Sequence, residues 1–253
     1  MGARILGLLL TAALALAPVF ARAEGEPACT APSELTRAEF ELPHLARALR
    51  DKTPTTILVV NSSAKPKAAT GTDAAPRRFS SYVEEGLRIR YPNGGVRVLT
   101  RNEPGFTAPD LAAALPGILA ETRPALVIWQ TGTHDAIRGV DLDSFARAVG
   151  NGIAQAQAAN ADVLVMSPQY SPRTEFAFDA SPYNSTLRWV SRTNDALFFD
   201  RYALMRYWAD EDIFDLDEWR PDPALFDNVH RCIGRLVTTM IVNGVTPKTV
   251  GSR

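Results

Sequence analysis

The stretch ILVVNSS, residues 57–63, decides the fold, because an apolar run there stops abruptly at three polar residues. A continuous apolar run is typical of a strand that helices cover on both faces of its sheet. Four more short strand-like segments, most of them largely apolar, follow along the chain at residues 96–100, 125–130, 162–166 and 197–200. We therefore predict five strands.

Helical patterns occupy the segments around these strands. They cover residues 35–50, 79–91, 109–121, 142–160, 183–194, 202–208 and 232–243. Pro43 can split the first of these helices, because proline lacks the N–H that a helix interior needs. Strands that alternate with helices predict an α/β chain: a three-layer α/β/α sandwich around a flavodoxin-like, mostly parallel, five-stranded sheet.

Residues 1–23 have the features of a secretory signal peptide. Arg4 supplies a positive start, residues 5–16 are an apolar stretch too short to span a bilayer comfortably, and an Ala-x-Ala cleavage signal ends at Ala23. We therefore expect cleavage after Ala23 and a periplasmic or secreted protein. The alternative is an uncleaved membrane anchor.

The rest of the chain has the size and composition of one exported domain. Residues 24–54 predict a polar leader and a helix, and residues 55–253 predict the α/β domain. The chain holds 27 basic and 28 acidic residues, so its charges nearly cancel. No basic block suggests nucleic acid, and no second apolar segment is long enough to cross a membrane.

Cys29 and Cys232 are the two cysteines of the chain. In an oxidising compartment such a pair often forms a disulfide, which here ties the N-terminal segment to the region of His230. The alternative is two buried thiols. No Cys-x-x-Cys motif or cluster of cysteine and histidine indicates a metal site.

Polar residues follow the predicted strands and precede the last predicted helix. Ligands of parallel sheets bind at the carboxyl ends of the strands, so these residues should share one crevice. Ser63 follows the first strand, and the motif DNVH, residues 227–230, can return to the same edge. Serine needs a histidine to take its proton, and the histidine needs a carboxylate to orient it, so these residues predict a hydrolytic triad.

Four sequence blocks, in this order, resemble those of the SGNH, or GDSL-type, hydrolases. The matching blocks are NSS at 61–63, Gly105, GTHD at 132–135 and DNVH at 227–230. Each block alone is a weak signal, whereas four in order at predicted strand ends are a strong one. The resemblance covers the chain from about residue 55 to the last helix.

The resemblance implies a role for each matched residue. Ser63 is the nucleophile, His230 is the general base and Asp227 orients the histidine. The backbone N–H groups of Ser63 and Gly105, together with the side chain of His134, form the oxyanion hole. Ser62 is the alternative nucleophile if the first block is shifted by one residue.

Three residues depart from the family pattern. Asn61 replaces a glycine, although asparagine tolerates the left-handed backbone that such a turn can require. Ser62 replaces an aspartate. His134 replaces the asparagine that donates to the oxyanion, and an imidazole N–H can donate in its place.

The resemblance implies a serine esterase that needs no cofactor and no metal, and residues 1–23 predict that it is exported. Its expected substrates are small-molecule or carbohydrate esters with short acyl groups such as acetyl, on envelope or extracellular carbohydrate. The alternative is a catalytically degenerate domain that binds a glycan or envelope ligand without turnover. Phosphate or nucleotide binding is not supported, because the loop after the first strand lacks the required glycine spacing.

Overall fold

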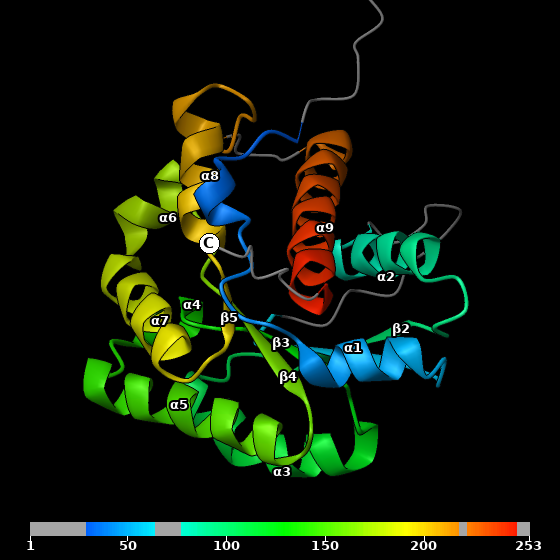
Figure 1. Ribbon diagram of the computed structural model, residues 1–253. Helices are drawn as coiled ribbons and strands as arrows, with labels where there is room; N and C mark the ends of the chain where they lie inside the picture. The colour runs from blue at the N-terminus through cyan, green and yellow to red at the C-terminus, as the bar shows by residue number, and fades with distance from the viewer. Residues whose placement is uncertain (1–28, 64–76, 218–221, 247–253) are drawn as a thin grey trace, which may run out of the picture.

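A computed structural model describes residues 29–63, 77–217 and 222–246 (Figure 1), so the predicted signal peptide lies outside the described residues. The core is a parallel sheet with the strand order β2-β1-β3-β4-β5. Its strands are β1 (Thr56–Asn61), β2 (Arg97–Asn102), β3 (Leu126–Gln130), β4 (Asp162–Met166) and β5 (Leu197–Phe199). The predicted five-stranded α/β fold is confirmed, and every strand pair is parallel.

Helices pack on both faces of this sheet. They are η1 (Ser33–Leu35, a 3₁₀ turn), α1 (Pro43–Arg50), α2 (Phe79–Arg90), α3 (Ala108–Thr122), α4 (Thr133–Arg138), α5 (Leu142–Ala158), α6 (Pro172–Ala177), α7 (Ser181–Thr193), α8 (Arg201–Asp210) and α9 (Pro223–Val245). Within the described ranges, no helix has the length and apolar character that a membrane span requires.

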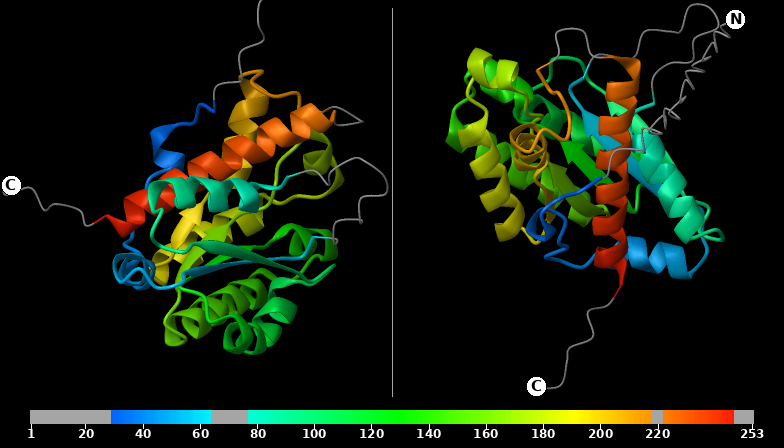
Figure 2. Two further views of the ribbon diagram at one scale, coloured as in Figure 1. Left: turned by 90° about the vertical axis from the view of Figure 1, so that its right-hand side faces the viewer. Right: turned by 90° about the horizontal axis from the view of Figure 1, so that it is seen from above.

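Alternate side chains of β1 enter the two halves of the core. Ile57 and Val59 pack with α1, α2, α8 and α9, whereas Leu58 and Val60 pack with α3, α5 and α7. Figure 2 shows α2 and α9 side by side on one face of the sheet and α3 and α5 on the other. All four side chains are at most 1% exposed, and burial of each contributes about 1.5–3 kcal/mol. Burial on both faces explains the continuous apolar run.

Two helices begin at a proline rather than where the sequence pattern predicted. Residues 35–50 do not form one helix, because α1 begins at Pro43, whose missing N–H is tolerated only in the first turn. The last helix begins at Pro223, not at residue 232, and the side chain of Asp222 caps it by accepting from the N–H of Ala224 at 3.1 Å. Residues 227–230 therefore lie inside α9.

The strand order reverses at β1, which lies between β2 and β3. The chain leaves β1 toward one edge of the sheet and returns on its other side to continue toward the opposite edge. The crevice outside the carboxyl ends of strands at such a reversal is the usual ligand site of open α/β sheets. The strand order therefore places a candidate site just after residue 61.

Candidate active site

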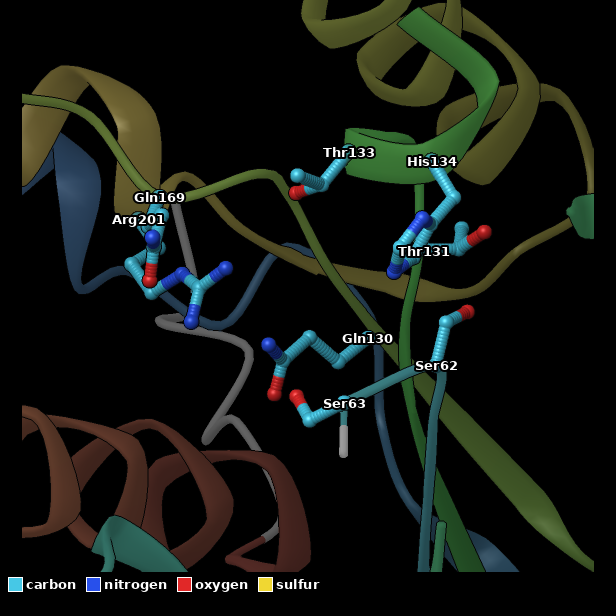
Figure 3. Close-up of a pocket in the computed structure, with 8 residues that line it drawn as sticks. All are labelled: Ser62, Ser63, Gln130, Thr131, Thr133, His134, Gln169 and Arg201. Atoms are coloured by element: carbon cyan, nitrogen blue, oxygen red, sulfur yellow. The ribbon is translucent and has the colours of Figure 1, made fainter. Parts of the chain in front are cut away.

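A pocket of about 190 Å³ lies at the carboxyl ends of the strands, next to the reversal at β1 (Figure 3). Its lining residues are Ser62, Ser63, Gln130, Thr131, Thr133, His134, Gln169 and Arg201. They come from the ends of β1 and β3, from α4, from the segment after β4 and from the start of α8. The structure thus brings together Ser63 and His134, as the sequence predicted.

Asn61 fixes the backbone at the candidate nucleophile. Its side chain is 5% exposed, and its Oδ1 accepts a hydrogen bond from the N–H of Ser63 at 2.9 Å. Asn61 does not use the left-handed backbone that asparagine tolerates, because it is the last residue of the extended strand β1. Figure 3 shows the Ser63 hydroxyl pointing toward the amide of Gln130, and the Ser62 hydroxyl toward Thr131.

Gly105 supports the same turn from outside the pocket. Its φ of 76° is in the left-handed region that favours glycine. Its N–H donates to the carbonyl oxygen of Ser62 at 3.1 Å, and Gly105 is not among the pocket-lining residues. Two of the three predicted oxyanion donors, the N–H groups of Ser63 and Gly105, are therefore engaged with the protein in this structure.

His134 is the predicted oxyanion donor that lines the pocket, and its neighbours fix its position. Gly132 has a φ of 98°, and a Cβ atom there would lie 2.9 Å from Cγ of Pro168. The buried carboxylate of Asp135 accepts from the N–H of Gly132 at 3.2 Å and from that of Ala108 at 2.8 Å. Burial raises the pKa of Asp135. These contacts hold the start of α4 against α3, so His134 projects toward the serines.

His230 has its Nδ1 occupied. That atom accepts a hydrogen bond from the backbone N–H of Phe79 at 3.2 Å, so the ring proton is on Nε2. Burial, together with the positive charges of Arg201 and Arg78, lowers the pKa of His230 to about 4, although the charge of Asp227 acts in the opposite direction. His230 is therefore neutral at neutral pH.

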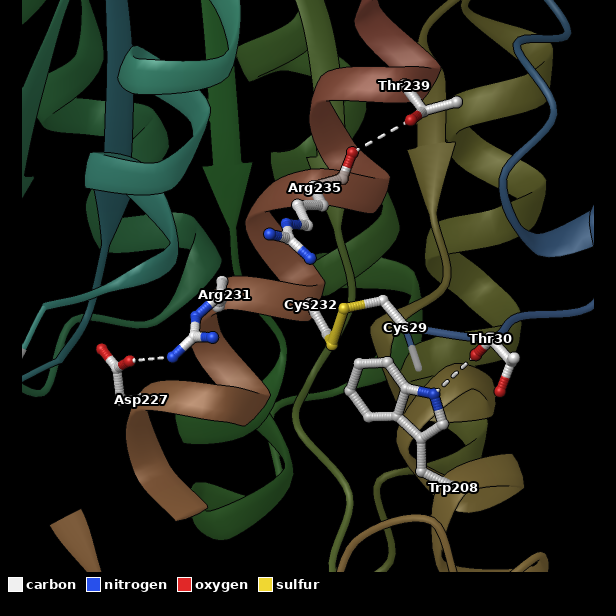
Figure 4. The surroundings of a disulfide bond; sticks show 8 residues. All are labelled: Cys29, Thr30, Trp208, Asp227, Arg231, Cys232, Arg235 and Thr239. Atoms are coloured by element: carbon white, nitrogen blue, oxygen red, sulfur yellow. Dashed lines mark hydrogen bonds and ion pairs between the residues drawn. A yellow bond between two sulfur atoms is a disulfide. The ribbon is translucent and has the colours of Figure 1, made fainter. Parts of the chain in front are cut away.

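Asp227 is bound to residues other than His230. Its carboxylate accepts from the hydroxyl of Tyr82 and from Nη2 of Arg231, the latter at 2.6 Å (Figure 4). These hydrogen bonds, led by that of Tyr82, lower the pKa of Asp227. The predicted hydrogen bond between Asp227 and His230 is not formed here, because α2 supplies both residues with other partners. Neither residue lines the pocket.

Cys29 and Cys232 form a disulfide with a Cα–Cα distance of 5.0 Å (Figure 4). A hydrogen bond next to the disulfide also holds this N-terminal segment: Nε1 of Trp208 donates to the carbonyl oxygen of Thr30 at 2.8 Å. Cys232 is two residues after His230 in α9, so the disulfide fixes the helix that carries the candidate base. Among the described residues, no group of histidine, cysteine and acidic side chains is arranged to hold a metal.

Arg201 is a pocket residue that the sequence reasoning missed. It is the first residue of α8, and the predicted helix began one residue later. The signal that could have identified it is its place directly after the fifth strand, at the same edge of the sheet as Ser63. The sequence shows the charge at that position, whereas the burial of the side chain depends on how the strands pack.

Comparison with known proteins places the chain in a family. Residues 28–247 match the family described as the non-GDSL lipase-like family. The chain is 31% identical over 131 residues to esterase TesA of Pseudomonas aeruginosa. That match covers 49% of this chain and spans 61% of the length of the esterase.

Solved structures share the fold. An acetyl-xylooligosaccharide esterase, Axe2 of Geobacillus stearothermophilus, superposes with a TM-score of 0.56 at 19% identity and covers 79% of this chain and 97% of its own. LAE5, an α/β hydrolase from the metagenome of Lake Arreo, has a TM-score of 0.58 at 15% identity and covers 75% and 96%. The predicted resemblance to SGNH-type hydrolases is confirmed, and the absence of Gly-Asp-Ser at residues 61–63 agrees with the family description. The chain belongs to the non-GDSL lipase-like family.

Proposed function

We propose that this protein is a serine esterase that uses Ser63 as its nucleophile. The observation that carries the proposal is the position of the Ser63 hydroxyl, in a polar pocket at the strand reversal that the candidate oxyanion donor His134 also lines. The esterase relative and the family both support ester hydrolysis. In addition, three catalytic mutants of Axe2 each replace one residue: a serine, a histidine or an aspartate. The aspartate of Axe2 precedes its histidine by three positions, as Asp227 precedes His230 in this chain.

The reaction follows from the roles of these groups. Oγ of Ser63 attacks the ester carbonyl, and its proton passes to Nε2 of His230. The tetrahedral intermediate expels the alcohol, which takes that proton, and water then releases the acyl group by the reverse sequence. His134 donates an N–H to the oxyanion. It takes this role because the backbone N–H groups of Ser63 and Gly105 already donate to other protein atoms.

The base requires a rearrangement before it can act. Nε2 of His230 must lose its proton to accept one from Ser63, so the proton must be on Nδ1, where the N–H of Phe79 now donates. An Nδ1–H needs an acceptor, and Asp227 stands three residues earlier on the same helix. We infer that Asp227 exchanges Tyr82 for His230 in the active arrangement.

We further propose that the protein is exported and removes short acyl groups, such as acetyl, from envelope or extracellular carbohydrate. The signal-like sequence of residues 1–23 and the disulfide support export. The small volume of the pocket supports a short acyl group. The acetylxylan esterases among proteins of the same fold support carbohydrate as the carrier of the acyl group.

Hydrolysis of para-nitrophenyl acetate and butyrate tests the proposal. Wild type is expected to turn over both esters, whereas Ser63→Ala and His230→Ala are expected to lose at least about 10³-fold in kcat. Ser62→Ala is the matched control, because it removes the adjacent hydroxyl in the same pocket. Turnover by Ser63→Ala equal to that of wild type contradicts the proposal.

A second candidate function is glycan binding without turnover. Two groups that catalysis would use are bound to other residues, which favours this function. The N–H of Ser63 donates to Asn61, and the carboxylate of Asp227 accepts from Tyr82. Calorimetry with an acetylated oligosaccharide separates the two functions. Equal binding by wild type and Ser63→Ala, with no release of acetate by wild type, supports the binding protein over the esterase.

A further inference from the structure

Arg201 is a buried cation in the wall of the pocket. It is 3% exposed, although it is the first residue of a helix. Figure 3 shows its guanidinium reaching across the pocket toward Gln130 and Ser63. The other lining residues contribute hydroxyl, amide and imidazole side chains, and none contributes a carboxylate.

Neutral groups hold the guanidinium in this position. Its Nε donates to the carbonyl oxygen of Ser167 at 3.1 Å. The amide of Gln130, oriented with its oxygen toward Arg201, accepts from Nη1 at 3.0 Å and from Nη2 at 3.2 Å. A guanidinium has five N–H donors, so these contacts leave two of them for a ligand.

No carboxylate compensates this charge among the described residues. The adjacent acid, Asp200, pairs with Arg188 and accepts from the N–H of Ala203 at 2.9 Å. Burial lowers the pKa of Arg201 to about 9, so the side chain is still protonated at neutral pH. A buried charge without a counter-charge is unfavourable, and a bound anion would remove that cost.

We propose that the pocket takes an ester that carries a carboxylate on its acyl or its alcohol part, and that Arg201 binds this carboxylate. That the bound molecule is an ester rests on the proposed esterase function. That the pocket binds an anion rests on the burial and the unpaired charge of Arg201. The guanidinium and the Ser63 hydroxyl line the same small pocket, so the anionic group lies close to the scissile bond.

Matched pairs of chromogenic esters test the proposal. Para-nitrophenyl hydrogen succinate and its methyl ester differ by a carboxylate on the acyl side. Acetoxy-nitrobenzoic acid and its methyl ester differ by a carboxylate on the alcohol side. Wild type is expected to prefer the acid of one pair by about 10- to 100-fold in kcat/KM, the range of a charged hydrogen bond. No preference for the acid in either pair overturns the proposal.

Three variants link the preference to Arg201. Arg201→Met is expected to abolish it. Gln130→Glu keeps Arg201 in place but puts a carboxylate where the amide oxygen of Gln130 now accepts from the guanidinium. Because this internal carboxylate neutralises Arg201, the variant is also expected to lose the preference. Arg206→Met, which removes an exposed arginine of the same helix, is the control and should retain it. A preference that survives Gln130→Glu and Arg201→Met contradicts the proposal.

A binding measurement keeps this test separate from that of the esterase. N-(para-nitrophenyl)succinamic acid is an amide analogue of the acidic acyl ester, and nitrobenzoic acid stands for the acidic alcohol side. Calorimetry with each acid and its methyl ester, in the Ser63→Ala background, needs no turnover. Tighter binding of one acid that Gln130→Glu removes supports the anion site even if no ester is hydrolysed. Equal binding of acid and methyl ester in both pairs overturns it.

Discussion

The backbone N–H of Phe79, at the start of α2, donates to Nδ1 of His230 in α9 at 3.2 Å. This hydrogen bond puts the ring proton on Nε2, the atom that a serine hydrolase needs as its base. On the same helix pair, Tyr82 of α2 holds the carboxylate of Asp227 in α9. The packing of α2 on α9 therefore controls both the tautomer of His230 and the availability of Asp227.

We predict that Tyr82→Phe raises kcat, by up to about tenfold. The change removes a hydroxyl that competes with His230 for the carboxylate of Asp227, and keeps the ring on which Arg77 stacks at 4.0 Å. A hydrogen bond to a charged group contributes about 1.5–3 kcal/mol, so its loss shifts the arrangement toward the active one. Steady-state kinetics with para-nitrophenyl acetate measure the effect.

Asp227→Asn is the companion variant. If Asp227 orients His230 during turnover, this change is expected to lower kcat by about 10⁴-fold, as in other hydrolases with a triad. A loss of less than tenfold would show that Asp227 does not orient the base, and would remove the rearrangement from the mechanism.

The lowered pKa of His230 predicts a loss of stability in acid. Near pH 7 the histidine is neutral in both the folded and the unfolded chain. Between its unfolded value of 6.5 and its folded value of about 4, only the unfolded chain binds the proton, so stability falls as the pH falls through this window. The contribution is at most about 3 kcal/mol.

Urea unfolding at pH 7 and at pH 4.5 checks this prediction against His230→Gln. Asp135 and Asp162, whose pKa values are raised by burial, act in the opposite direction, but they are present in both proteins. The difference between wild type and variant therefore isolates the histidine. An equal loss of stability in both proteins would contradict the pKa shift of His230.

His134 is expected to contribute to the rate rather than to binding of the ground state. Because the N–H groups of Ser63 and Gly105 are engaged, His134→Ala should lower kcat by about 10²–10³-fold with little change in KM. His134→Asn restores the residue of the wider family and should retain or raise the activity. An unchanged kcat in His134→Ala excludes the side chain from the oxyanion hole.

Removal of the disulfide should destabilise the chain. The residues of the pair are 203 positions apart, and a cross-link over so long a loop contributes up to about 5 kcal/mol through the entropy of the unfolded chain. A variant with Cys29→Ser and Cys232→Ser is expected to unfold at lower urea concentration than wild type. Dithiothreitol should lower the midpoint of wild type and not that of the variant, and equal midpoints without reductant would contradict the prediction.

The sheet could be predicted from the sequence because burial on both faces imposes a local pattern. Residues 57–60 are apolar without a break, and all of them lie in the core. Helix starts were harder to predict, since Pro43 and Pro223 can either break a helix or begin one. The choice at Pro223 depends on a cap from Asp222, and on the packing of α9 against α2.

The site could be predicted in part. Ser63 and His134 lie where strand order brings them, because the ends of parallel strands meet at one edge. The hydrogen bonds of Asp227 and His230 could not be predicted, since Tyr82 and Phe79 are about 150 residues away in sequence and meet them only when α2 packs on α9. Arg201 was missed for the same reason: its burial is a property of the assembled sheet edge.

Covalent labelling with a fluorophosphonate tests the central claim, that Ser63 is an activated nucleophile, most directly. Such a probe reacts with a serine only where a base and an oxyanion hole activate the hydroxyl. Peptide mass spectrometry should find the adduct on Ser63 in wild type and in Ser62→Ala, and none in Ser63→Ala. An adduct on Ser62, or no adduct on either serine of the folded wild-type protein, would contradict the account.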